Sequence, residues 1–97
     1  MEKTQRFQEI ADHQADWIGG TLEEQGDHAT RGNRLALSTT QIIGVRLQEE
    51  DGQMVFEVEG VAFNCQGSLS LLGEIQGEPG WRTFYGFNGH TWRIRKP

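Results

Sequence analysis

The spacing of apolar residues changes once along the chain, and this change constrains the fold more than any other feature of the sequence. Over residues 4–18 the apolar positions fall on one stripe of a helix with 3.6 residues per turn. From about residue 34 onward apolar and polar residues alternate, as in strands whose side chains point to opposite faces. The sequence therefore predicts an amphipathic helix over about 4–18 and strands over about 34–96. The helical stripe consists of Phe7, Ile10, Ala11, Trp17 and Ile18.

The segment between the predicted helix and the predicted strands contains residues typical of helix ends, helix caps and loops. Gly19 and Gly20 follow the helix directly, and a glycine in the left-handed conformation commonly ends a helix. Residues 21–24 have threonine first and glutamate fourth, which matches a capping box and predicts a further short turn of helix. Residues 26–34 show no periodicity, so we expect a loop there.

Tight turns divide the second half of the chain into short strands. Asp51-Gly52 and Asn88-Gly89 are dipeptides typical of two-residue hairpin turns. The apolar set just before Gly60 is even-numbered and the set just after it is odd-numbered, so we expect a bulge at Gly60 that keeps both sets on the core face. These sets are Met54, Phe56 and Val58, and Val61, Phe63 and Cys65. Together these signals predict an antiparallel β-meander over about residues 34–96.

One helix followed by five or six strands predicts the α+β class, with the helix packed on a curved antiparallel sheet. The alternative is a small SH3-like β-barrel with an N-terminal helix, because the glycines and the bulge would let the sheet curl until it closes. The sequence does not decide between an open sheet and a closed barrel. With 97 residues, the chain has room for a single domain, residues 1–97.

The composition argues against several classes of protein. No apolar run approaches the roughly 18 residues of a membrane-spanning helix, and residues 1–20 mix charged side chains where a signal peptide has an apolar core. Cys65 is the only cysteine, so an internal disulfide is excluded and a reducing compartment is favoured. We therefore expect a cytoplasmic protein that does not associate with membranes. No dinucleotide-binding or phosphate-binding motif occurs, and we expect no cofactor.

The net charge of −5 is unevenly distributed along the chain. Residues 1–60 contain five Lys/Arg and twelve Asp/Glu, whereas residues 61–97 contain four and two. Residues 79–97 contain no acidic residue and hold five of the nine aromatic residues. The acidic and basic parts either pair within the fold or between subunits, or form two faces of opposite charge. The basic residues of 79–97 are Arg82, Arg93, Arg95 and Lys96.

A two-residue turn at Asn88-Gly89 would fix which side chains of the last two strands are neighbours. The resulting pairs are Phe87 with His90, Tyr85 with Trp92, and Thr83 with Ile94. One face of this hairpin is then aromatic and supplies bulk to the core. The opposite face gathers Arg82, Phe84, Arg93 and Arg95. Those arginines either meet the acidic helix or loop, or form a binding surface.

That arginine face leads to our principal hypothesis, a non-enzymatic module that binds a protein partner or a small ligand. Arginine is enriched in interfaces, and a small domain with few large aliphatic side chains gains from association, so we expect a homodimer. The alternative is binding of single-stranded nucleic acid through guanidinium groups and an exposed phenylalanine. A net charge of −5 and a pI near 5.1 disfavour nucleic acid. The candidate binding residues are Arg82, Phe84, Arg93, Arg95, Trp92 and Tyr85.

A third hypothesis is a small enzyme with a histidine and carboxylates between helix and sheet. His13 lies four residues from Glu9 and three from Asp16, and His28 lies in the predicted loop. This reading requires a concave pocket that contains a histidine. The same groups offer too few ligands for a metal, so we expect no metal site. Cys65 shares parity with core-facing residues, and burial makes a thiol a poor nucleophile. We therefore favour a non-catalytic function and name no catalytic residue.

Overall fold

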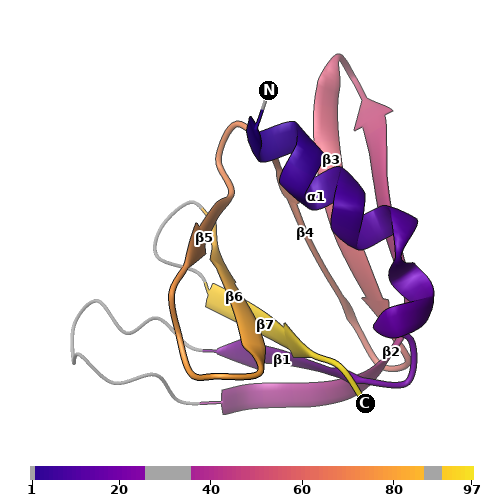
Figure 1. Ribbon diagram of the computed structural model, residues 1–97, viewed down its shortest axis with the longest axis vertical. Coiled ribbons are helices and arrows are strands. Elements are labelled where there is room, and N and C mark those ends of the chain that lie inside the picture. The colour runs from indigo at the N-terminus through magenta and orange to yellow at the C-terminus, as the bar shows by residue number, and fades with distance from the viewer. Residues whose placement is uncertain (1, 26–35, 87–90) are drawn as a thin grey trace.

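The computed structural model describes residues 2–25, 36–86 and 91–97. Helix α1, Glu2–Asp12, is followed by a 3-10 turn, η1, at Gln14–Asp16 (Figure 1). The predicted helix is present but shorter than expected, because His13 leaves the helical conformation at φ −108° and ψ 34°. Seven strands follow in the described residues: β1 Thr21–Gln25, β2 Ala36–Glu50, β3 Gln53–Gly60, β4 Asn64–Ser68, β5 Gly73–Ile75, β6 Trp81–Tyr85 and β7 Thr91–Arg95. The expected loop at 26–34 lies outside the described residues.

The strands form one antiparallel sheet in the order β4-β3-β2-β1-β7-β6-β5. Strands β1 to β4 make one meander and β5 to β7 make a second, and the pairing of β1 with β7 joins the two. Strands β4 and β5 are the edges, so the sheet is open and is not a closed barrel. The α+β class is confirmed, with seven strands in place of the expected five or six.

Strand β1 occupies the residues where the capping box predicts a turn of helix. Leu22 lies opposite Ile94 of β7, and both side chains are fully buried. On the other face, Glu23 accepts a hydrogen bond from Nε of Arg93 at 2.7 Å. Pairing with both β2 and β7 satisfies the backbone groups of this segment on two sides. That pairing outweighs a capping signal worth only about 1 kcal/mol, so the helical prediction for residues 21–24 is wrong.

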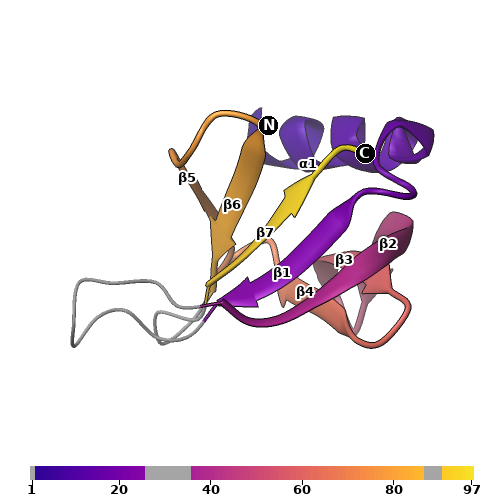
Figure 2. The same cartoon turned by 90° about the horizontal axis from the view of Figure 1, so that it is seen from below.

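The longest strand, β2, carries the bulge that the sequence places at Gly60. Its register with β3 shifts between Ile42 and Gly44. The extra residue, Ile43, is 52% exposed, and the shift allows Ile42 and Val45 both to be buried. Strand β3 ends at Gly60, and the residue after it, Val61, is 67% exposed. The bulge was therefore predicted on the wrong strand. Strand β2 pairs with β1 over its first part and with β3 beyond it, within a strongly curved sheet (Figure 2).

Helix α1 lies across the curved sheet (Figures 1 and 2). An aromatic cluster packs between the helix and the sheet. The ring of Phe7 lies 4.8 Å from that of Phe56 and 5.5 Å from that of Phe84, measured between centroids. Phe84 in turn contacts Trp92 at 4.8 Å. These rings come from α1, β3, β6 and β7, so one cluster joins the helix to both meanders. The other buried apolar residues are Ile10, Trp17, Leu22, Ile42, Val45, Val58, Cys65, Leu69, Leu72 and Ile94.

The hairpin of β6 and β7 differs by one residue from the predicted register. Phe84 pairs with Trp92, and Tyr85 pairs with Thr91. Five residues, 86–90, therefore separate the last pair where the sequence predicts two. A shift of one residue moves side chains to the opposite face. Phe84 consequently lies on the buried face with Trp92, where the sequence predicts Tyr85. The expected pair of Phe87 with His90 falls outside the described residues.

A close backbone approach at Gly20 places the end of the helical segment against the end of β7. Gly19 has the left-handed φ of 92°, but α1 already ends at Asp12 and η1 at Asp16, so the predicted helix end at Gly19 is wrong. Its N–H donates to the carbonyl of Ile42 at 2.9 Å. A Cβ atom on Gly20 would lie 2.0 Å from the carbonyl oxygen of Arg95 and 2.9 Å from that of Trp17. Only glycine permits this contact, which brings Trp17 close to the C-terminal end of β7.

We expect Gly20→Ala to lower the free energy of unfolding by about 1–3 kcal/mol, because backbone must move to accommodate the methyl group. Gly86→Ala is the matched control, since a Cβ there meets no atom within 4 Å. Urea unfolding followed by circular dichroism measures both variants. Equal midpoints for the two would contradict the close approach.

Candidate functional site

Two adjoining hollows lie between the α1–η1 segment and the strands β6 and β7, and we call them together the seam groove. The first, the basic hollow, has a volume of about 420 Å³. The second, the acidic hollow, has a volume of about 380 Å³. Both hollows are lined by Trp17, Arg82 and Lys96. The basic hollow adds Gly80, Trp81 and Arg95, and the acidic hollow adds Glu9, Ile10, His13 and Asp16.

The strand pairing explains why residues far apart in sequence line one hollow. Trp81 begins β6 and lies directly opposite Arg95, which ends β7. Arg95 is also paired with Thr21 at the start of β1, just after the segment that contains Trp17. Lys96 follows β7, and its Nζ lies 5.2 Å from the centroid of the Trp17 ring. The β1–β7 pairing therefore brings the end of the helical segment to the basic C-terminal segment.

A cationic side chain lies over each indole ring of the basic hollow. The guanidinium carbon of Arg95 lies 4.5 Å from the centroid of Trp81, and that of Arg93 lies 3.8 Å from it. Arg93 is neutralised by Glu23 at 2.7 Å. In contrast, neither Arg95 nor Lys96 forms an ion pair with any residue that the structure describes. Two positive charges without an ion-pair partner among the described residues thus line the same hollow.

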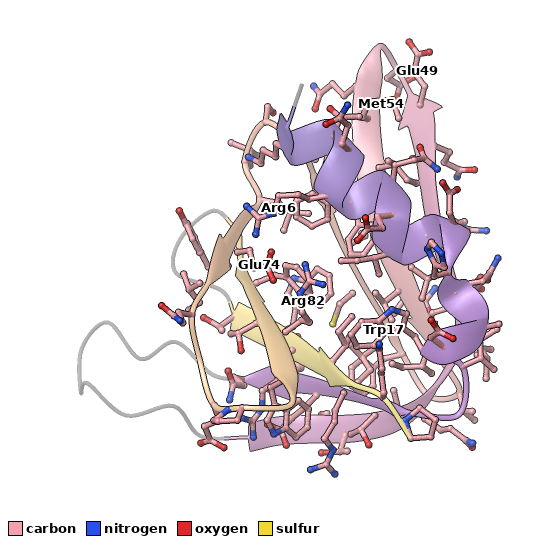
Figure 3. All side chains as sticks on the ribbon, in the orientation of Figure 1. Arg6, Trp17, Glu49, Met54, Glu74 and Arg82 are labelled. Carbon is pink, nitrogen blue, oxygen red and sulfur yellow. The ribbon has the colours of Figure 1, made fainter. Side chains whose placement is uncertain are left out.

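The third cation of the basic hollow, Arg82, is fixed by an ion cluster. Its Nη2 donates to Oε1 of Glu74 at 3.0 Å, and Arg6 of α1 bonds to the same carboxylate. Figure 3 shows the three side chains directed toward one another between α1 and β6. Burial acts to raise the pKa of Glu74, but the hydrogen bonds and charges of Arg82 and Arg6 hold it below its usual value. The cluster ties α1 to the sheet and sets the position of Arg82 in the groove.

The acidic hollow contains a histidine whose tautomer is fixed by its surroundings. Nδ1 of His13 lies 2.9 Å from the backbone carbonyl oxygen of Glu9. A carbonyl oxygen only accepts hydrogen bonds, so Nδ1 of the neutral ring carries the proton and Nε2 is left as an acceptor. Within the described part of the chain, the carboxylates of Glu9 and Asp16 form no ion pair. The pocket that the enzyme hypothesis requires is thus present at His13, while His28 lies outside the described residues.

The structure distributes the six predicted binding residues over three environments. Phe84 and Trp92 are buried in the aromatic cluster and do not face solvent. Tyr85 is exposed on the opposite face of the sheet, away from Phe84. Arg82 and Arg95 line the basic hollow, and Arg93 lies beside it over Trp81. The predicted surface of Arg82, Phe84, Arg93 and Arg95 is not assembled, because it depended on the incorrect register.

Sequence reasoning missed three side chains of the basic hollow, namely Trp17, Trp81 and Lys96. Trp81 and Lys96 belong to the basic aromatic segment 79–97, so composition alone could have included them. Trp17 belongs to the predicted helical stripe, and its side chain is buried. No local signal places it beside Lys96, because that contact depends on the long-range pairing of β1 with β7.

Cys65 is buried, and its environment is unfavourable for nucleophilic chemistry. Burial, with a further contribution from the negative charge of Glu24, raises the pKa of its thiol to about 12. At neutral pH the thiol is therefore almost entirely protonated. Among the residues described, no group of three or more His, Cys, Asp or Glu is arranged to hold a metal ion. No helix in the described ranges is long and apolar enough to cross a membrane.

Comparison with protein-family models, with curated proteins and with solved structures gives no match to this chain. The function is therefore argued from the geometry of the groove.

We expect Glu74→Gln to destabilise the protein in a pH-dependent way. Because the pKa of Glu74 is below its usual value of 4.5, its carboxylate stabilises the fold above that pH, and the contribution is lost as the pH falls through the folded-state pKa. The variant should unfold at lower urea concentration than the wild type at about pH 7, and the difference should narrow toward about pH 3. Glu49→Gln, an exposed site with the same charge change, is the control. A difference that stays constant with pH would contradict this role.

Proposed function

We propose that the protein is a binding module for a small ligand with an anionic group, which it holds in the basic hollow. The observation that carries this proposal is a pair of cations, Arg95 and Lys96, each placed over an indole ring that lines the hollow and neither ion-paired within ranges 2–25, 36–86 and 91–97. Most other basic side chains of the described residues pair with acids, including Arg6, Arg46, Arg82 and Arg93.

The contacts with tryptophan favour anion binding for two reasons. A cation over an aromatic face is partly fixed in position, so less side-chain entropy is lost when an anion binds. The indole rings also exclude water from one side of each cation, which strengthens its attraction to an anion. Arg95 can hold a carboxylate or phosphate through two parallel hydrogen bonds, while Lys96 supplies a compact second charge. The partly exposed indole ring of Trp81 then favours a ligand with a hydrocarbon portion.

A small ligand fits the molecule better than a nucleic acid strand does. Phe84, the residue expected to stack on a base, is fully buried. The net charge of −5 also opposes the approach of a polyanion, whereas a single carboxylate or phosphate meets only the local field of the hollow.

We expect hexanoate to bind the wild-type protein and to shift the indole N–H signals of Trp17 and Trp81 in an NMR titration, but not that of Trp92, which lines neither hollow. The double variant Arg95→Gln/Lys96→Gln should bind at least about tenfold more weakly, because it removes both charges that attract the anion. Lys3→Gln removes a cation that lines neither hollow and should leave the affinity unchanged. Equal binding by the double variant and the wild type would overturn the proposal.

Self-association is a second proposal, supported by three exposed apolar side chains on adjoining segments. Ile18 is 43% exposed, Ile43 52% and Val61 67%. The segments that carry them are joined by backbone hydrogen bonds, from Gly19 N–H to Ile42 O at 2.9 Å and from Val61 N–H to Gln41 O at 3.0 Å. Exposed apolar groups that lie close together commonly mark a protein interface. We propose that a second copy of this chain covers them.

We expect light scattering to give the mass of a dimer at both about 50 mM and about 500 mM salt, because burial of apolar surface is not screened by ions. Val61→Asp should give a monomer, since it introduces a charge into the contact. Leu71→Asp changes another exposed apolar residue, 54% exposed, and should leave the dimer intact. A monomeric wild-type protein at both salt concentrations would contradict self-association.

A further inference from the structure

The charges of the seam groove are unevenly distributed, because its acidic residues line only one of the two hollows. The basic hollow has no acidic residue among its lining residues. The acidic hollow adds the carboxylates of Glu9 and Asp16. Although Lys96 and Arg82 also line the acidic hollow, neither forms an ion pair with Glu9 or Asp16. Arg82 pairs with Glu74, and the Lys96 ammonium lies over the ring of Trp17.

A ligand with a single negative charge is attracted only by the basic hollow. An anion in the basic hollow that extends past Trp17 brings its other end beside Glu9 and Asp16. A second negative charge there would be repelled by the two carboxylates, and a hydrocarbon end would gain no electrostatic attraction from them. A positively charged end would neutralise them.

We propose that the ligand is a linear zwitterion, with its carboxylate in the basic hollow and an ammonium group in the acidic hollow. This inference rests on the proposed function and adds the second group of the ligand. An ammonium has three N–H donors and no acceptor. The acidic hollow offers three acceptor groups to it: the carboxylates of Glu9 and Asp16, and Nε2 of His13 in the tautomer that is protonated at Nδ1.

The position of Trp17 sets how far apart the two charges must lie. Its side chain lines both hollows, so the ligand passes along it from one hollow to the other. The two charges of an α-amino acid are separated by a single carbon and do not span this feature. An ω-amino acid of intermediate length spans the distance from one hollow to the other. An extended peptide of two or three residues with free ends, which reaches about 7–10 Å, spans it as well. Both share the same chemistry, a terminal ammonium and a terminal carboxylate joined by a linear chain.

Calorimetric titration with a series of simple probes tests this inference. We expect 6-aminohexanoate to bind at least about tenfold more tightly than hexanoate, which lacks the ammonium, and than glycine, whose charges are too close. Methylation of the amine to a trimethylammonium should reduce this advantage, because it removes the three donors. Triglycine distinguishes a peptide ligand from an ω-amino acid. Tighter binding of triglycine than of 6-aminohexanoate indicates a peptide, and weaker binding indicates an alkyl amino acid.

The double variant Glu9→Gln/Asp16→Asn should lose the preference for 6-aminohexanoate while its affinity for hexanoate does not fall. Glu49→Gln/Glu50→Gln makes the same charge change at exposed sites that line neither hollow, and should retain the preference. If the wild type binds hexanoate and 6-aminohexanoate equally, the zwitterion inference is wrong and the anion-binding function stands. If it binds neither, both are wrong.

Discussion

The packing of four aromatic rings is the interaction on which the rest of this structure depends. Phe7 comes from the helix, Phe56 from the first meander, and Phe84 and Trp92 from the second. Because the chain has few large aliphatic side chains, these rings supply much of the apolar volume that must be excluded from water. The cluster therefore sets the position of α1 over the sheet, and with it the seam along which the groove forms.

Periodicity predicts the broad architecture of the protein but not its details. The helical stripe and the later alternation are each repeated over many residues, so they indicate the elements correctly. The position of the bulge is different, since one unpaired residue on either strand restores the same alternation. Ile43 and Gly60 lie near one another across β2 and β3, and only the three-dimensional pairing distinguishes them.

The error in the last hairpin has a larger consequence for function. An Asn-Gly dipeptide favours a two-residue turn, yet a sheet register is also decided by which side chains can be buried. Burial of Phe84 against Phe7 and Trp92 selects the register seen here. The candidate surface built on the shorter turn therefore disappears, while its two outermost arginines, Arg82 and Arg95, come to line the groove. The partner of these arginines in the groove, Trp17, depends on a strand pairing across some seventy residues, which local sequence patterns do not contain.

The open sheet has a consequence for the behaviour of the protein at high concentration. An edge strand presents unpaired backbone groups that can template pairing with other chains, and fibrous aggregates grow in this way. Strand β5 has only three residues, which limits the number of hydrogen bonds that an added strand could form. Strand β4 carries Asn64 and Gln66 as exposed polar side chains and includes a glycine. The short edge strand β5 and the polar edge strand β4 thus oppose the addition of further strands to the open sheet.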